Sequence, residues 1–106
     1  MAKREPKDIV PKIKMLNGTG LLFTADGKRF VSAVDYKFRA KTFGEVPEWK
    51  GTISVLNEIP MEVEYVLELE QDDERTGKIR LEEVKQKHHK GVDSYAYTFR
   101  GVTPLK

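Results

Sequence analysis

Residues 61–70 show the clearest pattern in the chain, a strict alternation of two kinds of side chain. The apolar positions are Met61, Val63, Tyr65, Leu67 and Leu69, and the acidic positions between them are Glu62, Glu64, Glu68 and Glu70. Successive side chains of a strand point to opposite faces, so this pattern predicts a strand with an apolar face on a core and an acidic face outward. A slip of one residue would bury the carboxylates, so the register is strongly specified.

Similar alternation predicts further strands in three other segments. Residues 30–40 carry most of their apolar side chains at even positions, and 49–55 and 94–100 alternate in the same way. Between the β-prone segments 16–23 and 30–40 lies Asp26-Gly27, a pair that tolerates the positive φ angles of a tight hairpin. Glycines at 18 and 20 predict a bend or a close backbone approach, and residues 78–81 predict a strand that pairs with 61–70 as a hairpin.

Residues 81–90 fit two structures. Leu81, Val84 and His88 have helical spacing, and Gly91 would suit the end of a short helix. The segments on both sides are predicted strands, which instead favours a bulged strand that ends in a basic loop. We prefer the strand and keep the helix as the alternative.

These elements predict an all-β fold, a small antiparallel meander of about six strands that closes into a barrel or half-barrel. Closure hides strand edges and leaves no second face uncovered. A two-sheet β-sandwich is the alternative. Pro6 and Pro11 disfavour helix near the start, so residues 1–12 are predicted to be an extended or flexible basic N-terminal arm, and 13–106 a single all-β domain.

Composition and charge place the chain among small intracellular proteins. It has 106 residues, no cysteine and no apolar segment long enough for a signal peptide or a membrane span, so we expect a soluble cytoplasmic protein that does not bind a membrane. The net charge of +2 is uneven: residues 1–14 hold five bases and two acids, and the rest holds 14 bases and 15 acids. The body is therefore not uniformly basic.

No pattern of residues predicts catalysis, a metal or a cofactor. The two histidines, His88 and His89, are adjacent, so on a strand they point to opposite faces, and together with Asp93 they lack the spacing of a metal site. No serine lies in a nucleophile elbow, and the many carboxylates are explained by a solvated strand face and a polar turn. We expect a protein that is not an enzyme and holds no cofactor.

The charge segregation instead favours a protein-interaction module. Residues 58–74 hold eight acids and no base, while 28–41 are mainly basic, and such patches steer association with a protein partner or with a second copy of the chain. The predicted contact residues are those of the acidic strand and of the basic loop: Glu62, Glu64, Glu68, Glu70, Lys87, His88, His89 and Lys90.

Binding of single-stranded nucleic acid is the alternative function. Small barrels bind single strands with basic grooves and exposed aromatic rings. The predicted nucleic-acid contacts are Lys37, Arg39, Lys41 and Arg100. Against this function, alternation puts Tyr36 and Phe38 on the face opposite to the bases, whereas a stacking platform needs both kinds of residue on one face.

Overall fold

A computed structural model describes residues 13–41, 48–70 and 75–105, which form six strands and no helix. The strands are β1 (Ile13–Thr24), β2 (Phe30–Lys41), β3 (Trp49–Val55), β4 (Glu64–Leu69), β5 (Thr76–His89) and β6 (Val92–Gly101). The predicted all-β class is confirmed. These residues include no helix with the length and apolar character needed to cross a membrane. The predicted N-terminal arm, 1–12, lies outside the described residues.

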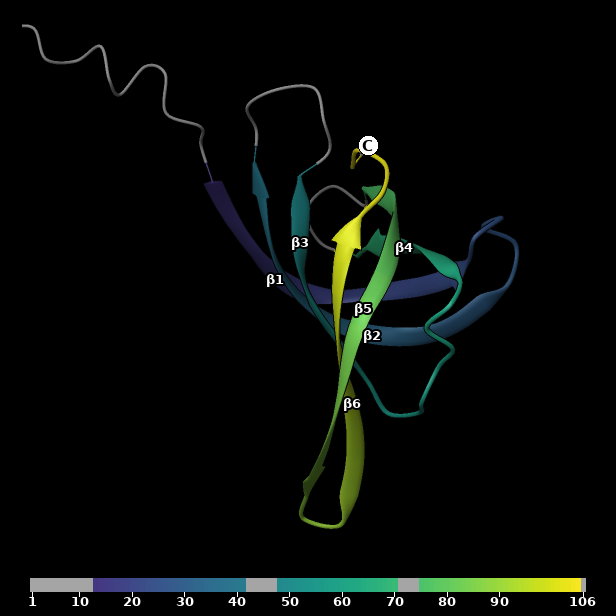
Figure 1. Cartoon of the computed structure of the whole chain (residues 1–106), viewed down its shortest axis with the longest axis vertical. Coiled ribbons are helices and arrows are strands. Elements are labelled where there is room, and N and C mark those ends of the chain that lie inside the picture. The colour runs from purple at the N-terminus through teal and green to yellow at the C-terminus, as the bar shows by residue number, and fades with distance from the viewer. Residues whose placement is uncertain (1–12, 42–47, 71–74, 106) are drawn as a thin grey trace, which may run out of the picture.

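The six strands form one closed antiparallel ring in the order β1-β2-β3-β6-β5-β4 (Figure 1). Two three-stranded meanders, β1–β3 and β4–β6, make up the ring, because β3 pairs with β6 and β1 pairs with β4. The predicted closure of about six antiparallel strands is confirmed, and all of them belong to one sheet. The finer strand order could not be predicted, since it depends on which edges of the two meanders meet.

The inside of the ring is filled by the apolar face of every strand. The largest fully buried side chains are Phe38, Phe99 and Tyr97, with Leu22, Ile53, Leu67, Leu69 and Ile79 around them. A small barrel has room only for its own side chains, and here aromatic rings meet edge to face, such as Phe38 with Phe99 at 6.1 Å between centroids. The described residues include no buried polar or charged side chain. The interior is therefore a packed core.

Trp49 closes the ring at the end where the chain terminates. A Cβ atom at Gly101 would collide with the Trp49 indole, and one at Gly77 would lie 2.6 Å from it, so both strands need glycine there. The indole Nε1 donates a hydrogen bond to the Thr103 carbonyl at 2.8 Å, which holds the C-terminal segment over the ring. Leu105 packs against the core beside it.

Two tyrosines organise the other end, where residues 56–63 connect β3 to β4. The Tyr97 hydroxyl accepts a hydrogen bond from the Ile59 N–H at 2.8 Å and donates one to the Ile59 carbonyl at 3.1 Å. The Tyr65 hydroxyl donates to the Pro60 carbonyl at 2.6 Å. Burial raises the pKa of Tyr65 above its ordinary value, and the nearby Tyr97 and Glu62 add to this effect.

The strand predicted for 61–70 is shorter than the alternation suggested. It begins at Glu64, so Met61, Glu62 and Val63 belong to the connection, and Val63 is 49% exposed although we placed it on the apolar face. The strand starts late because the preceding Ile59-Pro60 backbone is hydrogen-bonded to the hydroxyls of Tyr97 and Tyr65 and does not pair with a neighbouring strand. From Tyr65 onward the predicted faces are correct.

Residues 81–89 continue β5 as a strand and Lys90 lies in the turn that follows, so the preferred prediction is confirmed and the short helix is wrong. The pairing with β6 shifts between Leu81 and Glu83, which makes Glu82 the bulge that we expected in this segment. The 78–81 strand therefore extends much further than its apolar residues indicate.

The Asp26-Gly27 turn joins β1 and β2 as predicted, through a longer loop than a tight hairpin. Gly27 has a φ of 75°, and the Thr24 N–H donates to the Arg29 carbonyl at 2.9 Å. Asp26 accepts hydrogen bonds from the Thr24 hydroxyl at 2.6 Å and the Lys28 N–H at 2.9 Å. These bonds lower the pKa of Asp26, because they favour its charged form. The close backbone approach predicted at the glycines is present at Gly20, where a Cβ would lie 2.5 Å from the Glu68 carbonyl.

Candidate binding surfaces

Four cations form one row across the outer face of the ring, which we call the basic row. Arg39 on β2 lies opposite Lys50 on β3, and Lys50 lies opposite Arg100 on β6. Arg100 in turn lies opposite Arg80 on β5. All four residues are exposed. Adjacent strands are about 4.8 Å apart, so the row brings four positive charges within roughly 15 Å.

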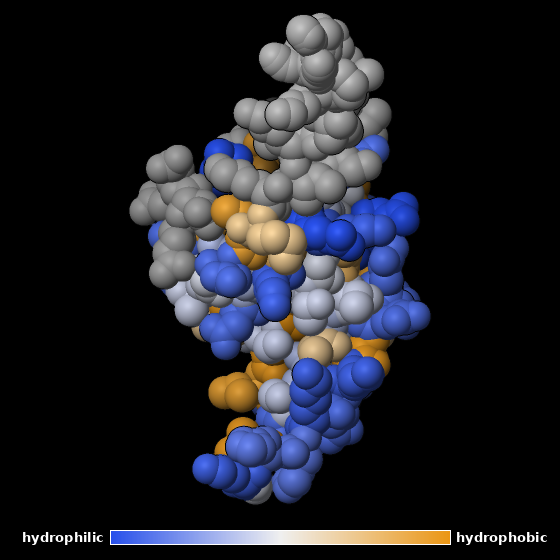
Figure 2. All heavy atoms as spheres, turned by 90° about the vertical axis from the view of Figure 1, so that its left-hand side faces the viewer, coloured by the Kyte–Doolittle hydropathy of each residue, from blue (hydrophilic) through white to orange (hydrophobic). Residues whose placement is uncertain are grey.

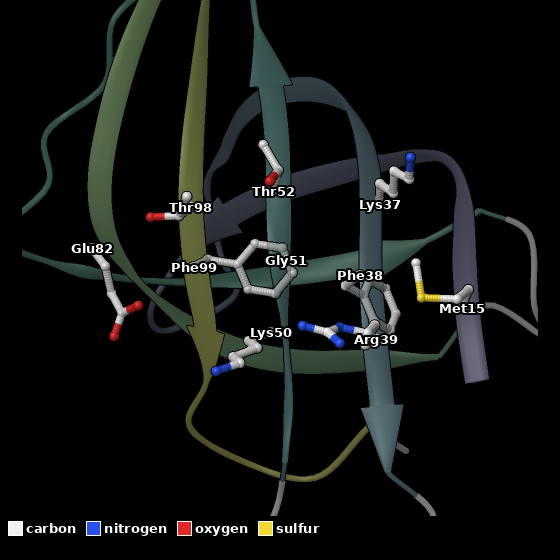
Figure 3. Close-up of a pocket in the computed structure, with 10 residues that line it drawn as sticks. All are labelled: Met15, Lys37, Phe38, Arg39, Lys50, Gly51, Thr52, Glu82, Thr98 and Phe99. Carbon is white, nitrogen blue, oxygen red and sulfur yellow. The ribbon is translucent and has the colours of Figure 1, made fainter. Parts of the chain in front are cut away.

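An open depression of about 350 Å³ lies beside the basic row (Figure 3). Arg39 and Lys50 line it together with Lys37, which is the next outward side chain along β2. Thr52 and Thr98, in register with Lys37 on β3 and β6, also line it. Figure 3 shows the Arg39 guanidinium reaching from β2 toward Lys50 on β3. Three cations and two hydroxyls therefore line one shallow hollow, and the carboxylate of Glu82, which is ion-paired with Arg100, lines it as well.

Only two members of the basic row have an ion-pair partner among the described residues. The Arg80 Nη2 lies 2.7 Å from the Glu64 carboxylate, and the Arg100 Nε lies 3.3 Å from that of Glu82. Arg39 and Lys50 form no ion pair with any carboxylate that the structure describes. The depression therefore carries positive charge that the described part of the fold does not neutralise.

The structure brings together most of the predicted nucleic-acid contacts. Arg39 and Arg100 belong to the basic row, and Lys37 lines the depression beside it. Lys41 ends β2, and its side chain lies outside the described part of the chain. The aromatic residues lie on the opposite face as expected, because Tyr36 and Phe38 are 2% and 1% exposed. The basic row has no stacking platform between its charges.

Beyond the ring, β5 and β6 continue as a two-stranded arm, residues 82–94 (Figure 1). β4 pairs with β5 only up to Arg80, and β3 pairs with β6 only from Tyr95 onward. Among the strands that the structure describes, each strand of the arm therefore pairs only with the other. Every residue from Glu82 to Asp93 is exposed. At about 3.3 Å per residue, the arm projects roughly 25 Å.

A two-residue turn ends the arm. Lys90 and Gly91 have φ angles of 52° and 80°, and His89 lies opposite Val92, which is the geometry of a type I′ hairpin. Just below the tip, the His88 Nδ1 lies 2.6 Å from the Asp93 carboxylate. The predicted contacts in this segment are thus gathered at the tip of the arm, at its most exposed point.

The two faces of the arm differ in chemistry. One face carries Lys85 and Lys87 opposite the small residues Ala96 and Ser94. The other face carries apolar side chains near the ring, with Val84 41% exposed. Figure 2 shows hydrophilic side chains over most of this part of the molecule and hydrophobic ones along one side. The arm is therefore amphipathic.

The acidic strand is less of a single surface than the sequence suggested. Glu64 is paired with Arg80, and the Glu70 carboxylate accepts a hydrogen bond from the Thr19 hydroxyl at 3.2 Å. Glu68 is half-buried on β4, and Glu62 is exposed in the connection before that strand. Two of the four predicted contacts are therefore engaged within the sheet.

Within the described ranges, no three histidine, aspartate or glutamate side chains gather as ligands for a metal ion. Comparison with family models, with curated proteins and with solved structures finds no match. Function therefore has to be argued from the surfaces alone.

Sequence reasoning missed Lys50, Thr52 and Thr98 as parts of one surface. Their outward direction follows from the alternation of β3 and β6. The pairing of β3 with β6 joins segments more than forty positions apart in the chain, and no local pattern predicts it. Only the register shows that the cations lie side by side.

Proposed function

We propose that this protein is a protein-interaction module without enzymatic activity, and that it contacts its partner through the arm. The observation that carries the proposal is the open edge of β5 from Glu82 to His89, which pairs with no other strand of the described residues on the side away from β6. Unpaired N–H and C=O groups on a strand edge are the template by which a partner adds a further strand.

The surroundings of this edge have the chemistry of a specific interface. Val84 on the edge strand is 41% exposed near the ring, and Tyr95, which lies opposite Gln86, is half-buried. An apolar centre with a charged rim is typical of protein interfaces. Lys85 and Lys87 on the edge strand disfavour indiscriminate pairing with other edges and so select a partner that carries acidic groups.

A shortened arm tests the proposal. Replacement of residues 87–94 by Asn-Gly places Gln86 and Tyr95 across a type I′ turn, which removes the tip and keeps the ring. The full chain and this variant are each used to recover bound proteins from an extract of the source organism, with a photo-crosslinker at Gln86 to locate contacts. We expect the full chain to crosslink a partner that the shortened chain fails to retain.

The matched control carries the crosslinker at Lys28, an exposed position in the 25–29 turn. Equal crosslinking from Lys28 and Gln86 would remove the arm from the interface, and equal recovery of the partner by the shortened chain would remove its outer part, residues 87–94. Trp49 fluorescence, which reports the far end of the ring, verifies that the variants are folded.

A further inference from the structure

The basic row is an arrangement that sheet energetics disfavour. Like charges directly opposite on neighbouring strands repel, and here three successive cross-strand pairs are cation against cation: Arg39 with Lys50, Lys50 with Arg100, and Arg100 with Arg80. Glu64 and Glu82 relieve one end of the row. The other end faces solvent without a described carboxylate partner, so an anionic ligand would relieve the remaining repulsion.

The donors around the depression match phosphate. The Arg39 guanidinium offers a planar fork suited to two oxygens of one phosphate, and Lys50 and Lys37 offer point charges on either side. The hydroxyls of Thr52 and Thr98 line the same hollow and can donate to further phosphate oxygens. Each of these side chains is anchored on a strand of the ring, which fixes the spacing of their backbone positions.

The shape of the charged surface favours a single polyanionic strand. The basic row is one file of cations, whereas a duplex presents two backbones separated by a groove. On the same side of the β5–β6 ladder, Glu82 and Glu83 lie between the basic row and Lys85 of the arm, so the continuous file of cations is confined to the ring. A chain with one charge at every unit can follow such a track.

We propose that the basic row binds the phosphate backbone of single-stranded nucleic acid. Its contacts are Lys37, Arg39, Lys50 and Arg100. Since the neighbouring aromatic rings are buried, binding is independent of base sequence and depends strongly on salt. This site lies on the ring and does not depend on the proposed role of the arm.

Fluorescence anisotropy of labelled oligothymidine of about 20 nucleotides tests the proposal with the full chain. The logarithm of the binding constant should fall with the logarithm of salt concentration, with a slope of about −0.7 for each phosphate neutralised. The double variant Arg39→Glu with Lys50→Glu should bind roughly a hundredfold more weakly at low salt and show a shallower slope. Both residues are exposed, so the variant should remain folded.

The matched control is Lys28→Glu, which reverses an exposed charge in the turn between β1 and β2, away from the basic row. It should change affinity by less than about threefold. The shortened arm keeps the basic row and should bind about as well as the full chain, so failure of one proposal does not entail failure of the other.

Three results would overturn the proposal. One is an equal loss of oligothymidine affinity in Lys28→Glu and in the basic-row variant, which would show that only the net charge of the protein matters. Another is a slope that the basic-row variant leaves unchanged. The third is equal competition by poly-glutamate at the same charge concentration, which would assign the basic row to an acidic protein segment instead.

Discussion

Strands β5 and β6 run through both the six-stranded ring and the arm, yet the two regions differ in burial and in pairing. In the ring, Ile79 and Leu81 of β5 are buried and lie opposite residues of β6. From Glu82 onward the same strand is exposed on both faces and unpaired on one edge. Strand pairing alone therefore does not produce a core. The ring is stable because its inward faces meet, and the arm owes its shape to one ladder of hydrogen bonds and its turn.

The largest expected effect comes from a charge placed inside the ring. Leu67 is fully buried, so Leu67→Asp puts an unpaired carboxylate into the core and should cost about 4 kcal/mol or more, enough to unfold a domain of this size. Circular dichroism with urea denaturation measures this change. Glu68→Lys, on the outer face of the same strand, should change stability by less than about 0.5 kcal/mol. Equal tolerance of both changes would contradict the assignment of the two faces of β4.

Glycines provide a second contrast between the two regions. Gly101→Ala should displace the Trp49 indole from the end of the ring, cost about 3 kcal/mol and shift Trp49 fluorescence to longer wavelength. Gly91→Ala at the tip of the arm meets no neighbouring atom within 4 Å and is disfavoured only by its φ of 80°. It should cost about 1 kcal/mol, without a fluorescence change. A larger loss of stability for Gly91→Ala than for Gly101→Ala would contradict the close packing of Trp49 on Gly101.

The shortened arm sharpens the comparison further. Removal of residues 87–94 takes away only exposed or half-buried side chains, so the free energy of unfolding should change by less than about 1 kcal/mol. Thermal denaturation of the full and shortened chains measures the difference. A large destabilisation would mean that the arm supports the ring.

A pH dependence is expected at the tyrosine end of the ring. Because the pKa of Tyr65 is raised in the folded state, its protonated form stabilises the fold. This contribution is complete below the unfolded pKa near 10.0 and is lost as the pH rises through the folded value. Tyr65→Phe should cost about 1 kcal/mol at neutral pH, through loss of the bond to Pro60. The urea midpoint of Tyr65→Phe should then fall less steeply above pH 10 than that of the original chain. Parallel curves for the two proteins would show that Tyr65 is not the source of the pH dependence.

Much of the ring could be predicted from the sequence, because its information is local. The alternation around Leu67 and Phe38 identified buried faces, and Asp26-Gly27 located a turn. The start of β4 was predicted wrongly because Val63 continues the alternation, while the hydrogen bonds that bend the preceding segment come from Tyr65 and, far along the chain, from Tyr97.

The candidate surfaces were harder to predict, because they depend on contacts between residues that are far apart in the chain. Arg39 and Arg100 were each identified as outward cations, but their proximity depends on Lys50 and on the pairing of β3 with both neighbours. The arm was predicted only as a strand leading to a basic loop. That it leaves the ring depends on where β4 and β3 stop pairing, which no pattern within 82–94 shows.

The most direct test of the difference between ring and arm is amide hydrogen exchange along β5, followed residue by residue by NMR. Amides of the ring, such as those of Ile79 and Leu81, should exchange only through global unfolding. Amides of residues 83–89 that face the open edge should exchange orders of magnitude faster, because no partner strand accepts their hydrogen bonds. Uniformly slow exchange from Ile79 to His89 would contradict an exposed arm, since it would show that the edge of β5 is covered.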